Sequence, residues 1–416
     1  MEDRKVTVYP YRWVVLTAFM LLMAVQQLLW ITFAPITRDA AAYYKVSDLG
    51  IGLLSMVFMI VYIVVSIPAS WLIDTVGIRV AVGLGAAFTG IFGLLRGIFS
   101  SDYTLVLIFQ ILIAVGQPLI MNAVSKIASR WFPAGERATA SGLSWLAGYV
   151  GLIVGLVLTP ALVARYNTPG MLLFYGVISV VAVSGFFIFA KEHPPTPQCL
   201  PGQEERSLVF DGIRQLVVKK EFILFTSIFF IGLGVFNGLS TWIEDIVRPR
   251  GFTSAQAGII GGLMVASGVI GSGIMPVLSD RLRNRSRFIL LAVAGSVPGL
   301  IGLAFARSYW EMLISGCIFG FFLLSTAPIG FQYCAEIGFP APEGTSTGIL
   351  MMAGQIAGIL FIFLMDMFKS PVTGSMTVPM IILIVLMMGT AFLSVRLHEA
   401  DPIPEKQETG LELQQP

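Results

Sequence analysis

Residues 71–79 read Trp71-Leu-Ile-Asp-Thr-Val-Gly-Ile-Arg79, and residues 278–283 read Leu-Ser-Asp-Arg-Leu-Arg. Each stretch is a short charged loop between two long apolar runs. Asp74 and Asp280 lie 206 residues apart, and the segments 138–148 (ATASGLSWLAG) and 344–354 (GTSTGILMMAG) repeat at the same offset. The matching offsets predict a duplicated unit, which is the layout of a secondary transporter with its site between the repeats.

The composition indicates a multi-pass membrane protein. Of the 416 residues, 56% are hydrophobic and only 12% are charged, whereas a soluble domain carries about 25% charged residues. Twelve helices of about 20 residues would fit this length. The net charge of +2 is too small for a nucleic-acid-binding protein, so we expect no nucleic-acid partner.

Hydropathy predicts an all-α membrane protein with twelve transmembrane helices in two pseudo-symmetric six-helix bundles. We expect an N-terminal bundle over 1–190, a linker over 191–221, a C-terminal bundle over 222–396 and a tail over 397–416. The predicted spans are 12–34, 50–73, 80–99, 104–124, 138–160, 170–190, 222–243, 255–278, 287–306, 309–331, 346–366 and 376–396.

The distribution of positive charge predicts the orientation. Of the 26 Lys and Arg residues, 18 fall on the side of the chain termini, seven fall on the other side, and Arg96 lies near the outer end of the third span. The positive-inside rule then places both termini in the cytoplasm. The short loops favour a prokaryotic plasma (inner) membrane.

No enzymatic or metal-binding pattern is present. The sequence contains no GxxxxGK[ST] or HExxH motif, and Cys199, Cys317 and Cys334 have neither pairable nor metal-ligand spacing. We expect neither an enzyme nor a cofactor or metal. No Asp or Glu falls mid-span, which favours facilitated diffusion by a uniporter over proton coupling. If coupling exists, Glu336 is the best candidate.

The loop at 71–79 resembles the Asp-x-x-Gly-x-Arg loop of the major facilitator superfamily, and 278–283 resembles a second copy that lacks the glycine. The resemblance implies alternating access by rocking of two halves, and a charge latch at the cytoplasmic helix ends. The latch residues would be Asp74, Arg79, Arg137, Asp280, Arg281 and Glu336.

In that fold helices 1, 4, 7 and 10 line a central cavity. Neutral amides and aromatic rings on these helices suit a small polar or cationic substrate, held by amide oxygens and cation-π contacts. The candidate lining residues are Gln26, Gln27, Trp30, Gln117, Asn122, Phe236, Asn237, Trp242, Gln332 and Tyr333, with Gln355 on helix 11.

A narrower resemblance covers nearly the whole membrane core. The stretches 54–59, 68–74, 77–79, 125–132, 335–340 and 343–348 are similar to the feline leukaemia virus subgroup C receptor-related transporters, solute carrier family 49. That family includes carriers of choline and ethanolamine, a vitamin B6 carrier and members assigned heme export. Its choline carriers surround the ammonium with an aromatic on helix 1, a glutamine on helix 4 and an aromatic on helix 7.

Trp30 and Gln117 match the first two of these positions, whereas Asn237 stands where the choline carriers have tyrosine. Losing one ring weakens the case for choline itself, so ethanolamine-like and vitamin-like (pyridoxine) substrates become comparable candidates. Heme ranks lower, because Tyr333 is the one axial ligand type that we place in the cavity.

We therefore expect a secondary transporter of a small cationic amine or amino alcohol that works by alternating access as a monomeric uniporter. Trp30 and Gln117 would contact the substrate, with Phe236, Asn237, Gln26 and Gln355 as further members. The alternatives are a proton-coupled carrier of a pyridoxine-like or heme-type substrate, and a ligand-binding membrane receptor. The expected partners are the small-molecule substrate and the lipid bilayer.

Overall fold

The computed structural model describes residues 9–133, 136–195, 216–282, 284–338 and 343–399. Most of the expected linker and tail, at 196–215 and 400–416, lie outside the described residues. The described elements are α1 (Tyr11–Ile31), η1 (Ala34–Ile36), α2 (Thr37–Tyr44), α3 (Asp48–Thr75), α4 (Ile78–Ile98), α5 (Tyr103–Met121), α6 (Val124–Trp131), α7 (Arg137–Phe189), α9 (Lys220–Thr241), α10 (Ile243–Val247), η3 (Arg248–Arg250), α11 (Ser254–Leu282), α12 (Arg285–Phe305), α13 (Tyr309–Gly338), α14 (Glu343–Met367) and α15 (Thr377–Ser394).

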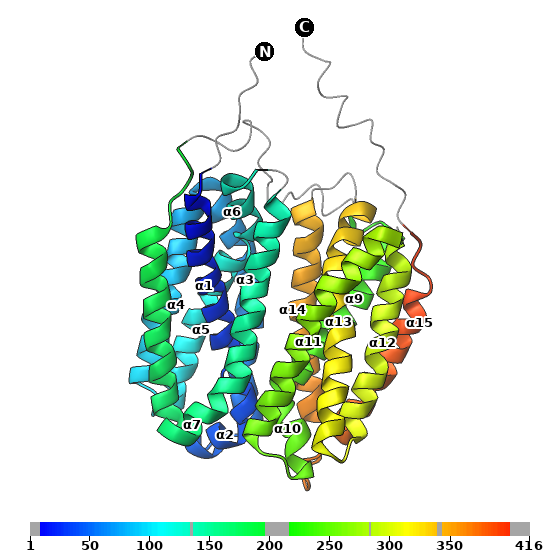
Figure 1. Ribbon diagram of the computed structural model, residues 1–416. Coiled ribbons are helices and arrows are strands. Elements are labelled where there is room, and N and C mark those ends of the chain that lie inside the picture. The colour runs from blue at the N-terminus through cyan, green and yellow to red at the C-terminus, as the bar shows by residue number, and fades with distance from the viewer. Residues whose placement is uncertain (1–8, 134–135, 196–215, 283, 339–342, 400–416) are drawn as a thin grey trace.

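The helices form two side-by-side bundles, α1–α7 and α9–α15 (Figure 1). Eleven described helices are long and apolar enough to cross a membrane. One of these, α7, has 53 residues and would extend about 80 Å if straight, far beyond a hydrocarbon core of about 30 Å. It breaks at Asn167, where φ is 58° and ψ is 175°. The predicted fold of twelve helices in two bundles is therefore confirmed.

Predicted and observed helix bounds mostly agree within a few residues. The largest extension is α13, which continues to Gly338 where the sequence predicted an end at 331. This extension contains the polar residues Gln332 and Glu336, so its low hydropathy gave no sign that the helix continues. The short helices α2, α6 and α10 lie at the two ends of the bundles (Figure 1). Their lengths of five to eight residues give no membrane-span signal.

The loop that opened the sequence analysis has a specific geometry. Gly77 connects α3 to α4 with a φ of 109°, and a Cβ atom there would lie 2.5 Å from Oε1 of Glu192. The Glu192 carboxylate accepts the backbone N–H groups of Ile78 (3.0 Å) and Arg79 (2.6 Å). It thereby satisfies donors at the start of α4 that have no partner within the helix. The glycine is required both by its backbone conformation and by the nearby carboxylate.

The bundles meet mainly where α7 packs against α11 and α3 against α14. Gly258 of α11 faces α7, since a Cβ there would lie 2.2 Å from the carbonyl oxygen of Leu156. Gly151 of α7 instead faces α1 of its own bundle, since a Cβ atom there would lie 1.9 Å from the carbonyl oxygen of Ala24. Small residues thus permit close backbone approach both between and within the bundles.

We call the end of the molecule with α6 the α6 end, and the opposite end, with α2 and α10, the α10 end (Figure 1). Helix α1 begins at the α6 end and α15 finishes there. At the α10 end, η1 and α2 of the first bundle contact α10 of the second. At this end the two bundles are therefore joined by short helices as well as by their long helices.

Candidate substrate site

The centre of the first bundle presents a polar pair. Gln117 Nε2 donates to Gln27 Oε1 at 3.3 Å, which links α5 to α1. Gln117 is 5% exposed and Trp30 is 7% exposed. Neither Gln117 Oε1 nor Trp30 Nε1 has a hydrogen-bond partner. A buried polar atom without a hydrogen-bond partner reduces the stability of the fold by about 1–3 kcal/mol. A ligand that forms a hydrogen bond with either atom would remove this cost.

Two other predicted residues of this bundle already have protein partners. Gln26 donates from Nε2 to the Ile113 carbonyl (3.1 Å), and its Oε1 accepts from Thr89 Oγ1 (2.8 Å). Asn122 accepts from Tyr62 Oη at 2.9 Å and donates to Ser66 and Ser70 of α3. Both amides tie helices of the first bundle together.

The second bundle contributes Phe236 and Asn237 from α9 and Gln355 from α14. Phe236 is 7% exposed and lines a cavity. Asn237 lies where α9, α14 and α3 meet: a Cβ on Gly358 would fall 2.7 Å from its Nδ2 and 2.5 Å from Met59 Sδ. Gln355 is half-buried. The structure thus places Asn237 at a contact between the bundles.

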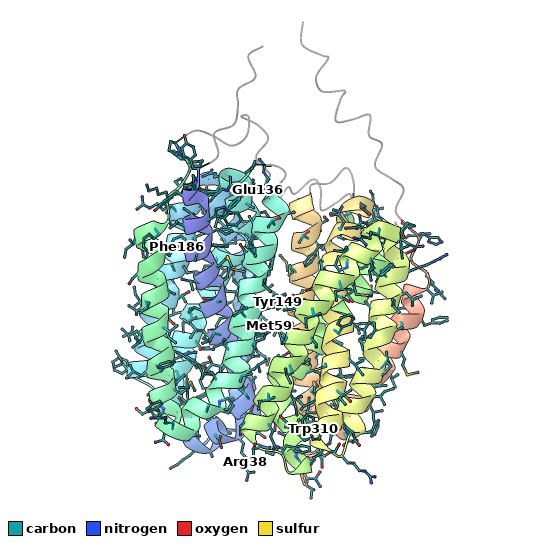
Figure 2. All side chains as sticks on the ribbon, in the orientation of Figure 1. Arg38, Met59, Glu136, Tyr149, Phe186 and Trp310 are labelled. Carbon is teal, nitrogen blue, oxygen red and sulfur yellow. The ribbon has the colours of Figure 1, made fainter. Side chains whose placement is uncertain are left out.

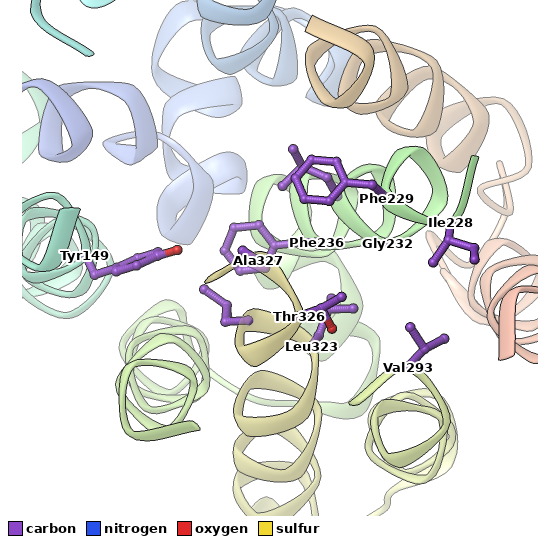
Figure 3. Close-up of a pocket in the computed structure, with 11 residues that line it drawn as sticks. Tyr149, Ile228, Phe229, Gly232, Phe236, Val293, Leu323, Thr326 and Ala327 are labelled. Carbon is purple, nitrogen blue, oxygen red and sulfur yellow. The ribbon is translucent and has the colours of Figure 1, made fainter. Parts of the chain in front are cut away.

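The cavity beside Phe236 has a volume of about 70 Å³ and lies among α9, α12 and α13. Tyr149 of α7 points towards Phe236 from the first bundle (Figure 3). It lies about half-way between the two ends of the molecule, at the same height as Met59 (Figure 2). Sequence reasoning missed Tyr149, because a tyrosine within an apolar run gives no signal that distinguishes it from a core residue.

Tyr333 lies elsewhere. Its side chain is fully buried, donates to the carbonyl of His398 at 2.8 Å and packs edge-on against Phe225. Those contacts hold the end of α13 to the segment after α15, at the α6 end. Tyr333 therefore does not share the central cavity with Phe236.

The predicted latch residues at the α6 end pair within their own bundles. Lys126 Nζ is 3.2 Å from Asp74 Oδ1 in the first bundle. In the second bundle, Arg285 lies 2.8 Å from both Asp280 Oδ1 and Glu336 Oε2. The sequence identified the carboxylates but not Lys126 and Arg285, their basic partners.

The three predicted latch arginines are not part of these pairs. Arg137 Nε donates to the Phe132 carbonyl at 3.4 Å. Arg79 and Arg281 are exposed at the α6 end, at the start of α4 and near the end of α11. Within the described residues, the ion pairs at this end do not cross between the bundles.

The α10 end carries a charge cluster that does cross between the bundles. Lys369, which follows α14, contacts Asp48 at the start of α3 and lies 2.7 Å from Asp245 of α10. Arg248 lies 2.9 Å from Asp245 Oδ1 and 3.3 Å from Asp48 Oδ2. Burial disfavours the charged lysine, but the two aspartates outweigh it and raise the pKa of Lys369. Asp48 belongs to the first bundle and the other three to the second.

Glu244 of α10 adds a second connection at this end. Its Oε2 accepts the backbone N–H of Arg38 at 2.8 Å, and its Oε1 accepts from Ser254 Oγ at 3.1 Å. The carboxyl group is 2% exposed. Burial, with a smaller contribution from Asp245, raises the pKa of Glu244 to about 7.

Comparison with known proteins identifies the family. Residues 15–362 match the model of the Major Facilitator Superfamily. The chain is also 30% identical over 381 residues to Solute carrier family 49 member A3 of Danio rerio, covering 88% of this chain and 80% of that protein. The chain belongs to the major facilitator superfamily and, within it, to solute carrier family 49. It is a transporter and a multi-pass membrane protein.

Two further proteins are similar. The Choline/ethanolamine transporter FLVCR1 of Mus musculus is 30% identical over 388 residues, which covers 85% of this chain and 69% of that protein. The crystal structure of a bacterial homolog to the human lysosomal transporter Spinster, in an inward-facing and unoccupied conformation, superposes with a TM-score of 0.74. It is 15% identical and covers 93% of this chain and 97% of that chain. The solved structure supports the fold alone.

Proposed function

We propose that this chain transports a small cationic amine or amino alcohol, of the choline and ethanolamine kind, by alternating access as a uniporter. Trp30 and Gln117 contact the substrate, with Phe236, Asn237 and Gln355 from the second bundle as further contacts. The α6 end faces the cytoplasm of the cell, the membrane is the plasma membrane, and the working unit is a monomer.

The observation that carries this proposal is the pair of unpartnered buried polar atoms on α1 and α5, Trp30 Nε1 and Gln117 Oε1. The Gln117 oxygen can accept from an ammonium or hydroxyl group, and the indole can hold a cation against its face or donate to an oxygen. The names of the similar transporters agree with such a ligand. Gln26 and Asn122 act instead through the helix contacts described above.

The positions of the carboxylates support uniport. Every described Asp or Glu of the membrane-spanning helices lies within four residues of a helix end. Proton-driven carriers usually hold a titratable group deep in the membrane. Proton coupling is the second candidate mechanism because of Glu244, which is buried at the α10 end and has a pKa of about 7.

The proposal can be tested by ligand-induced stabilisation of the purified protein. A ligand that binds the native state at 100 times its Kd stabilises it by about 2.7 kcal/mol. We expect choline or ethanolamine to raise the melting temperature and Trp30→Ala to abolish the rise. Trp310→Ala is the matched control, since Trp310 is 72% exposed at the α10 end (Figure 2). Equal stabilisation of wild type and Trp30→Ala would contradict the site, and no stabilisation by any amine would contradict the substrate class.

A further inference from the structure

The cavity beside Phe236 is a recess in the second bundle that faces the first. Its lining residues come from α9, α12 and α13, and Tyr149 of α7 lines it from the side of the first bundle (Figure 3). Phe229, Gly232, Phe236 and Leu323 make its surface almost entirely apolar. None of the described residues that line it is charged.

The first bundle carries amide groups at the same depth. A Cβ on Gly148 would lie 3.4 Å from Gln27 Cγ, so Tyr149, the next residue, lies at the depth of the Gln27–Gln117 pair. A substrate bound between the bundles at this depth would lie in the layer that holds both the amide pair of the first bundle and the apolar recess of the second. Such a site matches a molecule with a polar end and an apolar end.

The volume limits what can enter. The recess of about 70 Å³ is roughly half of the ~150 Å³ engineered cavity that accepts benzene. A branched alkyl group of three or four carbons would therefore fit, whereas a whole aromatic ring would not.

Besides the Tyr149 hydroxyl, the described lining residues carry one polar side-chain group, the hydroxyl of Thr326. Thr326 is 7% exposed, and its Oγ1 has no hydrogen-bond partner. The adjacent Ser325 satisfies its own hydroxyl by donating to the Phe322 carbonyl at 2.6 Å. An unpartnered buried hydroxyl is an unusual feature in an otherwise apolar wall, and it is available to a ligand.

We infer that this recess is a substrate subsite for a short branched alkyl group. The substrate is then an amino alcohol whose amine and hydroxyl face Gln27 and Gln117 and whose alkyl branch packs among Phe229, Phe236 and Leu323. The inference rests on the proposed function and narrows its substrate class from bare ethanolamine to alkyl-substituted amino alcohols.

A ligand series tests the inference on the full-length protein. Ethanolamine is compared with analogues that carry a methyl, isopropyl, tert-butyl or phenyl group on carbon 2, by thermal stabilisation over a range of concentrations. Each buried carbon contributes about fourfold in affinity. We expect the isopropyl and tert-butyl analogues to bind at least about tenfold more tightly than ethanolamine, and the phenyl analogue to lose this gain. A series without a preference, or one that keeps improving through phenyl, would overturn the inference.

A filling variant locates the subsite. A Cβ on Gly232 would meet only Leu323 Cδ1, at 3.6 Å, so Gly232→Ala places a methyl group in the recess without a clash. We expect this variant to lose the preference for the isopropyl and tert-butyl analogues while it binds ethanolamine as wild type does. Gly273→Ala on α11 is the matched control, because a Cβ there meets nothing within 4 Å. Unchanged selectivity in Gly232→Ala would overturn the assignment.

The outcomes separate the two proposals. If ethanolamine and all of its analogues bind equally well and Gly232→Ala changes nothing, the subsite is wrong and the proposed function stands. If no member of the series stabilises the protein, the proposed function fails and the subsite fails with it.

Discussion

The two ends of the molecule hold their charges differently. At the α10 end, Lys369 and Arg248 of the second bundle both contact Asp48 of the first. At the α6 end, Arg285 binds Asp280 and Glu336 of its own bundle. Ion pairs that cross between bundles oppose their separation, whereas pairs within a bundle do not. The crossing ion pairs therefore hold the two bundles together at the α10 end, which we call the closed end.

Burial reinforces the difference. The side chains of Asp245 and Lys369 are 0% and 12% exposed, whereas those of Arg285, Glu336 and Asp280 are 20%, 18% and 61% exposed. Removing one partner of a buried ion pair costs about 3–5 kcal/mol, because it leaves the other charge desolvated and unpaired. An exposed pair contributes about 0–1 kcal/mol. The same substitution should therefore have much larger consequences at the α10 end.

The largest expected effect is that of Lys369→Met. Asp48 and Asp245 would lose their shared lysine, and opening of the α10 end would hydrate both carboxylates. We expect a shift of about 3 kcal/mol towards the open form, at the lower end of the range because Arg248 still contacts both aspartates. Spin labels at the exposed Tyr43 and Val372, one in each bundle, should report a longer distance.

Lys369→Arg is the control for that experiment, since it keeps the positive charge. If Lys369→Met leaves the distance between the labels unchanged, the cluster does not hold the α10 end closed. If the arginine variant opens as far as the methionine variant, the effect comes from side-chain shape and not from charge.

A smaller effect should follow from Glu244. Its pKa is about 7 while buried and should return towards its ordinary value of 4.5 when the α10 end opens to water. A raised pKa means that the closed form binds the proton more tightly. The closed fraction should therefore rise as the pH falls from 8 through 7, and the rise should level off near pH 4.5.

The same pair of labels, followed between pH 8 and pH 5, measures this dependence. We expect up to about a 75-fold change in the open-to-closed ratio if the pKa returns fully to its ordinary value, and loss of this change in Glu244→Gln. The Glu244 carboxyl group is surrounded by Arg38, Asp39, Asp245, Arg248 and Ser254. Glu244→Gln is therefore needed to distinguish titration of Glu244 from titration of these neighbours. An unchanged slope in Glu244→Gln would assign the proton to another residue.

The sequence predicted the fold well because each membrane-spanning helix must satisfy the requirement for apolar residues on its own. A membrane-spanning segment must be apolar along its length, so hydropathy alone located the spans within a few residues. Partners across the fold were not predictable in this way. Lys369 and Asp48 are 321 residues apart, and no local pattern joins them.

The candidate site was predicted in part for a similar reason. Trp30 and Gln117 stood out as polar side chains in apolar helices, and the structure finds both with an unpartnered buried atom. Gln26 and Asn122 gave the same sequence signal, yet hydrogen bonds to neighbouring helices occupy them. Polarity in a membrane helix thus indicates that a partner is needed, and the geometry decides whether that partner is protein or ligand.

The smallest expected effect, that of Arg285→Ala, sharpens the comparison most. Arg285 contacts the exposed Asp280 and the largely buried Glu336 of its own bundle, so its loss should cost more than the about 0–1 kcal/mol of an exposed pair and less than the about 3–5 kcal/mol of a buried one, without affecting the separation of the bundles. The distance between labels at Val76 and Leu282, exposed at the α6 end, should not change. A changed distance would show that these charges already couple the bundles and that the contrast between the ends is wrong. In the Lys369→Met background we expect the α6 end to close, and Arg285→Ala in that background tests whether Arg285 then latches the two bundles. If it does, Arg285→Ala lowers the population with a closed α6 end. If it does not, the effects of Lys369→Met and Arg285→Ala on the label distances are additive.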